Sequence, residues 1–168
     1  MALERIWAPW RLEYVQNADS RDGCFLCDAA AAAGDEDERH LVVHRGERAI
    51  VVLNKFPYAS GHLLVAPTRH DVGFGDLDDD EALEIHRLAA DGMDALQAIY
   101  RPEGFNLGWN IGRIAGAGIP AHGHLHVVPR WAGDTNFMPV LGDVKVIPEH
   151  LLATRARLSA SWPGSRPG

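Results

Sequence analysis

Histidines occupy every second position of a short run in this chain, at His122, His124 and His126, and an apolar pair follows them. Side chains of an extended strand alternate between its two faces, so this spacing puts all three imidazoles on one face. The residues between them, a glycine and a leucine, then point to the opposite face. Imidazole has an unperturbed pKa of about 6.5, so its neutral and protonated forms coexist near neutral pH. The run therefore predicts a strand with one packing face and one face that can hold a neutral nucleophile beside proton donors.

Two simpler interpretations fit the same histidines. A half-buried strand can have a solvated face that is rich in histidine, and a row of imidazoles can bind a metal. The shared phase of the three side chains and the apolar pair Val127-Val128 favour a catalytic face over both.

The motif His122-x-His124-x-His126 with its apolar tail resembles the signature of the histidine triad family, whose nucleotide hydrolases and transferases attack an α-phosphate with the middle histidine. The resemblance implies that His124 is the nucleophile and that His126 contacts the phosphate or the leaving group. It extends over residues 7 to 162 and points to the bacterial diadenosine polyphosphate hydrolases and phosphorylases. The implied fold is α+β, an antiparallel sheet of about five strands with one long helix and a C-terminal helix, assembled as a homodimer.

The length of the chain is that of one domain. Its 168 residues, of which 46% are hydrophobic, can bury their own core. We expect a single domain over residues 1–168, with an N-terminal arm at 1–23 and a frayed tail at 163–168.

Charge and hydropathy exclude two classes of partner. A formal net charge of -7 argues against nucleic acid, because nucleic-acid binding usually requires a basic face. The chain has neither a run like a signal peptide nor the roughly 18 consecutive apolar residues of a membrane span. Two cysteines, three residues apart, suit a reducing compartment. We therefore expect a cytoplasmic protein with no membrane partner.

Hydrophobic periodicity predicts the order of the elements. Apolar runs on either side of Gly46 predict an antiparallel hairpin, and His40 and His44 are interpreted as surface residues of its first strand. The long helix is predicted to bury an apolar side that includes Leu83, and the closing helix one that includes Leu152. The expected elements are a short helix at 28–33, strands at 40–44, 49–53, 62–67 and 105–111, the histidine strand, a long helix at 79–100 and a closing helix at 149–161.

A second motif of the resemblance lies in the turn between the second and third strands. Asn54, a proline-containing turn and then Gly61-His62 are similar to the family's nucleotide-binding segment. This implies that Asn54 bonds the ribose hydroxyls and that His62 lies near the phosphates. Taken alone, Asn54 is an ordinary turn residue and His62 a histidine at the start of a strand.

A glycine-rich loop at residues 112–118 leads into the histidine strand. Part of it matches the loose dinucleotide pattern, but that fingerprint opens a helix, whereas this loop opens an alternating strand. Backbone N–H groups near Gly118 and the side chain of Asn110 are candidates to stabilise charge on a phosphate. Many members of the histidine triad family carry Gln-Ser or Gln-Thr where this chain has Gly118 and Ile119. This departure favours phosphorylase-like or broad polyphosphate chemistry.

The pair Cys24-x-x-Cys27 can be a redox couple, half of a zinc site, or two small packed side chains. The redox interpretation requires a thioredoxin-like context, which the sequence lacks. The resemblance implies a zinc site completed by His70 and by His122, and four protein ligands make such a site closed and structural. His122 is thus a candidate both for the phosphate and for the zinc.

Together these residues predict an enzyme that cleaves diadenosine polyphosphates or related adenosine nucleotides at the α-phosphate, with water or phosphate as acceptor. A nucleoside phosphoramidase would use the same histidines to cleave a P–N bond. A nucleotide-binding protein with little turnover is the alternative from another class.

Overall fold

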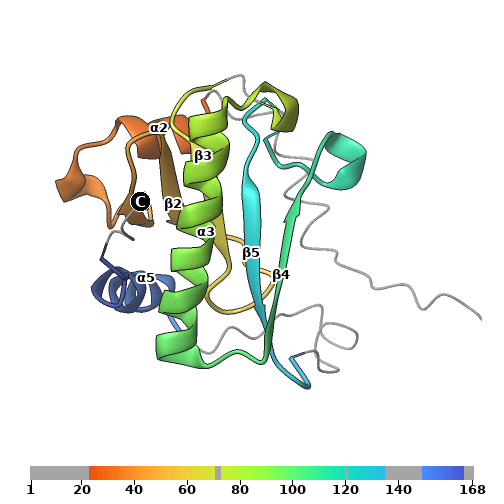
Figure 1. Ribbon diagram of the computed structural model, residues 1–168. Coiled ribbons are helices and arrows are strands. Elements are labelled where there is room, and N and C mark those ends of the chain that lie inside the picture. The colour runs from red at the N-terminus through yellow and green to blue at the C-terminus, as the bar shows by residue number, and fades with distance from the viewer. Residues whose placement is uncertain (1–22, 71–72, 120, 135–148, 165–168) are drawn as a thin grey trace, which may run out of the picture.

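The computed structural model describes residues 23–70, 73–119, 121–134 and 149–164, which form an α+β domain (Figure 1). Residues 1–22 of the predicted N-terminal arm and most of the predicted tail lie outside the described residues. Among the described helices, none combines the length and the apolar character that a bilayer span requires. The elements are α2 (Phe25–Ala31), η2 (Gly34–Glu36), β1 (Val42–Arg45), β2 (Ala49–Leu53), β3 (Leu63–Pro67), η3 (Phe74–Asp76), α3 (Asp79–Tyr100), β4 (Gly104–Trp109), η4 (Arg113–Ala115), β5 (Leu125–Arg130) and α5 (Leu151–Ala160), where η denotes a 3-10 helix.

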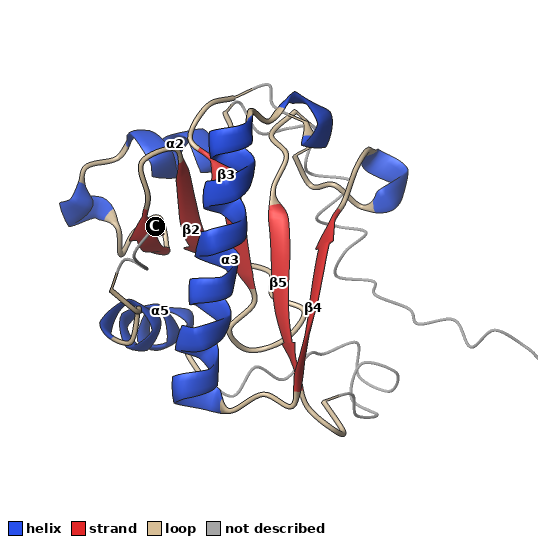
Figure 2. Ribbon diagram, viewed as in Figure 1, coloured by secondary structure: helices blue, strands red, loops and turns tan. Residues whose placement is uncertain are grey.

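The five strands form one antiparallel sheet in the order β1-β2-β3-β5-β4 (Figure 2). Every residue of β2 and β3 is buried, as their continuous apolar sequences require. β1 begins two residues after its predicted start, because Leu41 adopts a left-handed φ of 56° that an extended strand does not accommodate. The predicted fold class and strand set are confirmed.

Helices cover both faces of the sheet because the central strands are apolar on both faces. Val51 and Leu53 of β2 pack into a core with α3 and α5, and α3 runs along the sheet in Figure 1. Ile50 and Val52 point the other way, into a smaller core with the fully buried Leu26 of α2. The short helix α2, which contains Cys27 and directly follows Cys24, is thereby fixed against the sheet.

The long helix α3 has the predicted bounds because both of its ends carry strong local signals. At its N-terminus the Asp78 carboxylate accepts a hydrogen bond from Glu81 N at 2.8 Å, and the Glu81 carboxylate accepts one from Asp78 N at 3.0 Å. This reciprocal pair is a capping box. At the other end Arg101 takes a left-handed φ of 47° immediately before Pro102, which cannot continue a helix.

Two leucines predicted on the buried sides of helices are exposed, Leu83 by 47% and Leu152 by 38%. Leu83 lies two residues before the buried Ile85, which is about 200° around a helix. In α5, Leu151 and Leu158 are seven residues apart and share the face toward the core, whereas Leu152 lies off that face. The prediction was wrong for both residues because it followed hydrophobicity and not angular position.

Gly61, in the turn before β3, has a φ of 81°, and a Cβ built there would lie 2.5 Å from Leu96 Cδ2. We expect Gly61→Ala to lower the free energy of unfolding by about 2 kcal/mol, because the left-handed backbone and the overlap both oppose a side chain. Urea denaturation measures the change. Gly34→Ala is the matched control, since nothing lies within 4 Å of its Cβ position. Equal losses in the two variants would contradict the prediction.

Candidate functional site

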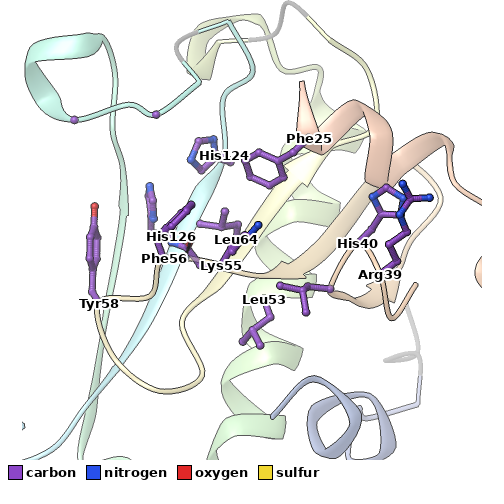
Figure 3. A pocket seen from close by; sticks show the side chains of 14 residues that line it. Phe25, Arg39, His40, Leu53, Lys55, Phe56, Tyr58, Leu64, His124 and His126 are labelled. Carbon is purple, nitrogen blue, oxygen red and sulfur yellow. Dashed lines mark hydrogen bonds between the residues drawn. The ribbon is translucent and has the colours of Figure 1, made fainter. Parts of the chain in front are cut away.

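A pocket with a volume of about 210 Å³ opens beside the start of β5 (Figure 3). His124 and His126 line it from β5 and the residues just before it. Asn54, which follows β2, lines it too, and Gly116 and Gly118 contribute from the loop between β4 and β5. The pocket therefore brings together the histidine run, the predicted ribose-binding turn and the glycine-rich loop.

The remaining wall of the pocket combines apolar side chains with nitrogen-bearing polar ones. Its apolar part comes from Phe25, Leu41, Leu53, Phe56 and Leu64. Arg39, His40 and Lys55 also line it, and Figure 3 shows Arg39 and His40 on the side of the pocket away from His124. An apolar wall suits the flat ring of a nucleobase, and the positive charges of Arg39 and Lys55 suit an anionic ligand.

His124 is held as a neutral imidazole with one defined tautomer. Its side chain is buried, and its Nδ1–H donates a hydrogen bond to the backbone oxygen of His122 at 2.9 Å. Burial lowers the pKa of His124, and the nearby imidazole of His122 adds to this effect, while the bond to the carbonyl opposes it. The proton on Nδ1 leaves the lone pair on Nε2, which is the state required of a nucleophile.

A chain of hydrogen bonds orients His126. The backbone N–H of Tyr58 donates to His62 Nδ1 at 3.0 Å, so the proton of a neutral His62 lies on Nε2. His62 Nε2 lies 2.9 Å from His126 Nδ1 and donates to it. His126 must then carry its own proton on Nε2. This series of hydrogen bonds makes His126 Nε2–H a donor beside the lone pair of His124. The ring centroids of His124 and His126 lie 4.9 Å apart.

His62 and Asn110 support the pocket without lining it. Asn110 Nδ2 lies 3.2 Å from His126 Nε2 and donates to the backbone oxygen of Gly116 at 3.4 Å. Asn54 Oδ1 accepts from Phe56 N at 2.9 Å, and Asn54 Nδ2 lies 3.2 Å from His62 Nδ1. Three of the predicted residues thus form one network around His126.

The two cysteines meet two histidines on the other side of the histidine run. Ligand atoms of Cys24, Cys27, His70 and His122 all lie within 4.8 Å of one another. The Nδ1 atom of His122 is 3.3 Å from Cys24 Sγ and 3.4 Å from Cys27 Sγ, and His70 Nδ1 is 3.2 Å from Cys27 Sγ. Two thiolates and two imidazoles at such distances fit a tetrahedral zinc ion.

Electrostatics at the cluster favour the thiolate. Burial opposes ionisation of Cys24, but hydrogen bonds from the His122 side chain and from the Cys27 backbone outweigh it and lower the pKa of Cys24 to about 6. His122 is fully buried, and its Nε2–H donates to the backbone oxygen of Pro67 at 2.8 Å. That bond makes Nδ1 the nitrogen that faces the cysteines and would give up its proton when a metal binds. The His122 side chain therefore belongs to this candidate metal cluster of Cys24, Cys27, His70 and His122, and it does not line the pocket.

Comparison with known proteins decides the family of this chain. The profile of the HIT domain matches residues 36–133. The chain belongs to the HIT family. An AP-4-A phosphorylase from Mycobacterium tuberculosis (strain ATCC 25618 / H37Rv) is 39% identical over 165 residues, which cover 95% of this HIT chain and 85% of the relative. An uncharacterized HIT-like protein, MG132 of Mycoplasma genitalium, is 32% identical over 119 residues, covering 71% of this chain and 81% of the relative.

Solved structures of HIT proteins share the fold. A Zn-bound histidine triad family protein from Mycobacterium smegmatis superposes with a TM-score of 0.64 at 22% identity, covering 83% of this chain and 92% of the other. A HIT family protein from Bacillus anthracis gives a TM-score of 0.56 at 28% identity, covering 67% of this chain and 76% of the other.

The HIT fold also brings residues to the pocket that sequence reasoning missed. His40 was interpreted as strand surface, but it precedes β1 and lines the pocket. The reason is the pairing of β1 with β2, in which Leu53 N donates to Leu41 O at 2.8 Å and so places His40 near Asn54. Cross-strand register of this kind is not visible in a single sequence. Phe25 was missed too, although its place beside Cys24 was a usable signal.

Proposed function

We propose that this HIT protein cleaves dinucleoside polyphosphates, with diadenosine tetraphosphate as the representative substrate, at the α-phosphate through a nucleotidyl-histidine intermediate. The observation that carries the proposal is the buried His124, whose Nδ1–H is bonded to a carbonyl at 2.9 Å beside a pocket of about 210 Å³. The 39% identity to an AP-4-A phosphorylase over 95% of the chain supports it.

In the first step His124 Nε2 attacks the α-phosphorus. A P–N bond forms, the P–O bond to the rest of the substrate breaks, and its electron pair moves to the departing oxygen. The Nε2–H of His126 donates a hydrogen bond to that oxygen and stabilises its charge. In the second step water or inorganic phosphate attacks the α-phosphorus, the P–N bond breaks, and AMP or ADP is released. Which acceptor is used decides between a hydrolase and a phosphorylase.

Binding is assigned to the rest of the pocket. Asn54 bonds the ribose, the apolar wall around Phe25 contacts the base, and backbone N–H groups near Gly118 contact phosphate oxygens. The protein has a formal net charge of -7, but Lys55 and Arg39 supply positive charge at the pocket. This local positive charge attracts a polyphosphate to the pocket.

The metal cluster is proposed to hold zinc in a structural role. Cys24 precedes α2, Cys27 lies in its first turn, and His70 follows β3. A bound zinc ion would supply coordinate bonds that tie these segments to His122 and, through the His122 carbonyl, to the position of His124. No step of the cleavage requires the metal.

Product analysis tests the proposed function. The protein is incubated with diadenosine tetraphosphate, with and without inorganic phosphate, and the products are separated by anion exchange. ADP plus ATP that appears only with phosphate identifies a phosphorylase, and AMP plus ATP without phosphate identifies a hydrolase. Absence of cleavage in both conditions would overturn the assignment, and a P–N substrate is then tested for phosphoramidase activity.

We also infer that the protein is a homodimer joined through β4. This strand is at the edge of the sheet, and Leu107 on it is 47% exposed, with Ile111 and Ile114 beyond it still more exposed. An exposed apolar edge strand favours pairing with a second copy of itself. We expect Leu107→Lys to convert a dimer into a monomer of 18.4 kDa in sedimentation equilibrium. A monomeric parent protein would contradict this inference.

A further inference from the structure

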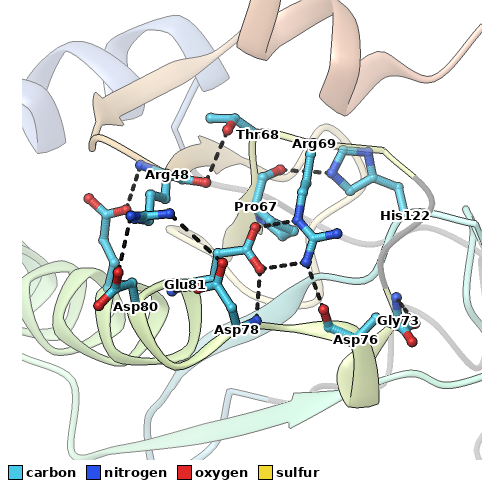
Figure 4. A network of polar contacts seen from close by, with 11 residues as sticks. Arg48, Pro67, Thr68, Arg69, Gly73, Asp76, Asp78, Asp80, Glu81 and His122 are labelled. Carbon is cyan, nitrogen blue, oxygen red and sulfur yellow. Dashed lines mark hydrogen bonds and ion pairs between the residues drawn. The ribbon is translucent and has the colours of Figure 1, made fainter.

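The ion pair of Arg69 and Glu81 lies next to the metal cluster and makes more hydrogen bonds than a helix cap requires (Figure 4). Arg69 Nε and Nη2 donate to the two oxygens of the Glu81 carboxylate at 2.5 and 2.7 Å. The same Nη2 donates to the backbone oxygen of Asp76 at 2.6 Å. The Glu81 side chain is only 5% exposed, whereas that of Arg69 is 49% exposed. The carboxylate is therefore the fixed partner, and the guanidinium is the group that it holds.

Ordinary capping does not account for this arrangement. The capping box of α3 needs only the two hydrogen bonds between Asp78 and Glu81. A fork of parallel hydrogen bonds adds geometric specificity that a surface ion pair lacks. The hydrogen bond from Arg69 is the main cause of a lowered pKa of Glu81, so the carboxylate is charged at neutral pH.

The segment that Arg69 anchors contributes to both histidines of the cluster. Pro67, at the end of β3, presents its carbonyl to His122 Nε2 at 2.8 Å. His70, directly after Arg69, brings its Nδ1 to within 3.2 Å of Cys27 Sγ and 3.4 Å of His122 Nδ1. Figure 4 shows Arg69 between the N-terminal end of α3 and His122. His70 is exposed, so burial does not hold it in place.

We propose that Glu81 and Arg69 are positioning residues for the metal cluster: the buried carboxylate holds the guanidinium, and the guanidinium fixes the backbone that presents His70 to the cysteines. The proposal rests on the proposed zinc site. Its physical basis is preorganisation, because a ligand already held in place loses less conformational freedom when the metal binds.

Zinc affinity, measured by competition with a chromophoric chelator, tests the proposal. We expect Arg69→Met and Glu81→Gln each to weaken zinc binding about 10- to 100-fold. Arg69→Lys, which keeps the charge but not the fork, is expected to recover only part of the affinity. Cobalt(II) in place of zinc gives a second readout, since its absorption spectrum reports tetrahedral thiolate coordination independently of activity.

Asp78→Ala is the matched control. It removes the acceptor for Glu81 N and weakens the helix cap, but it leaves the bonds between Arg69 and Glu81 intact. We expect a lower melting temperature and unchanged zinc affinity. An equal loss of affinity in Asp78→Ala and Arg69→Met would overturn the proposal, because the effect would then come from the helix cap. Parent-like affinity in both Arg69→Met and Glu81→Gln would overturn it too, whereas a parent protein without zinc would refute the metal site itself.

Discussion

His124→Ala is expected to lower the rate of diadenosine tetraphosphate cleavage about 10⁴-fold or more and to leave AMP binding within a few fold of the parent protein. The reason is that the variant loses the only nitrogen that forms the covalent intermediate, while the walls of the pocket stay in place. Steady-state rates and calorimetric titration with AMP measure the two quantities. Mass spectrometry of the parent protein, quenched during turnover, is expected to show a nucleotidyl group on His124 that the variant lacks.

His86→Ala is the matched control for this substitution, because His86 lies on the exposed side of α3, away from the pocket. We expect it to retain the parent rate. Parent-like turnover in His124→Ala would remove His124 as nucleophile. If the parent protein and His124→Ala both bound AMP and neither cleaved the substrate, a nucleotide-binding role would replace the enzymatic one.

Cys24→Ser is expected to abolish stoichiometric zinc binding and to lower the free energy of unfolding by about 3 kcal/mol or more when zinc is present. The thiol of Cys24 ionises easily, since its pKa is lowered to about 6. Serine puts in its place a hydroxyl that does not ionise near neutral pH. Elemental analysis measures the metal, and scanning calorimetry measures the stability. A slower cleavage rate is expected as well, because His122 supplies both a cluster ligand and the carbonyl that holds His124.

The comparison that matters is the response to added zinc. The melting temperature of the parent protein is expected to rise with zinc and to fall with a chelator, and that of Cys24→Ser to respond to neither. If the chelator left the parent protein unchanged and no metal were found in it, the two cysteines would be packing residues.

Local signals in the sequence were sufficient for the bounds of α3. An acidic cap at Asp78, a Glu three residues later and a proline after Arg101 all lie within one turn of the helix ends that they determine. The strands were predictable for the same reason, because an apolar run between turn residues is a local pattern. The cysteine–histidine cluster depended on the family resemblance, since its members are up to 98 residues apart in the chain.

The position of His122 could not be predicted from alternation alone. The rule that alternate side chains share a face holds within a strand, and β5 begins only at Leu125. The residues before that point are outside the strand, so His122 faces the cysteines while His124 and His126 line the pocket. The hydrogen-bond chain through His62 was equally hidden, because it begins at a backbone N–H of Tyr58 that no side-chain pattern reveals.

That backbone N–H has a chemical consequence for the bond that is cleaved. An amide donor cannot become an acceptor, so His62 Nδ1 stays unprotonated, and an extra proton shared with His126 would find no stable arrangement. A neutral imidazole pair can offer the departing group a hydrogen bond but no acidic proton. A polyphosphate departs as an oxyanion and needs only such solvation, whereas an amine must gain a proton to depart. The direction of a single peptide group thereby determines which nitrogen of His126 carries the proton that faces the departing group.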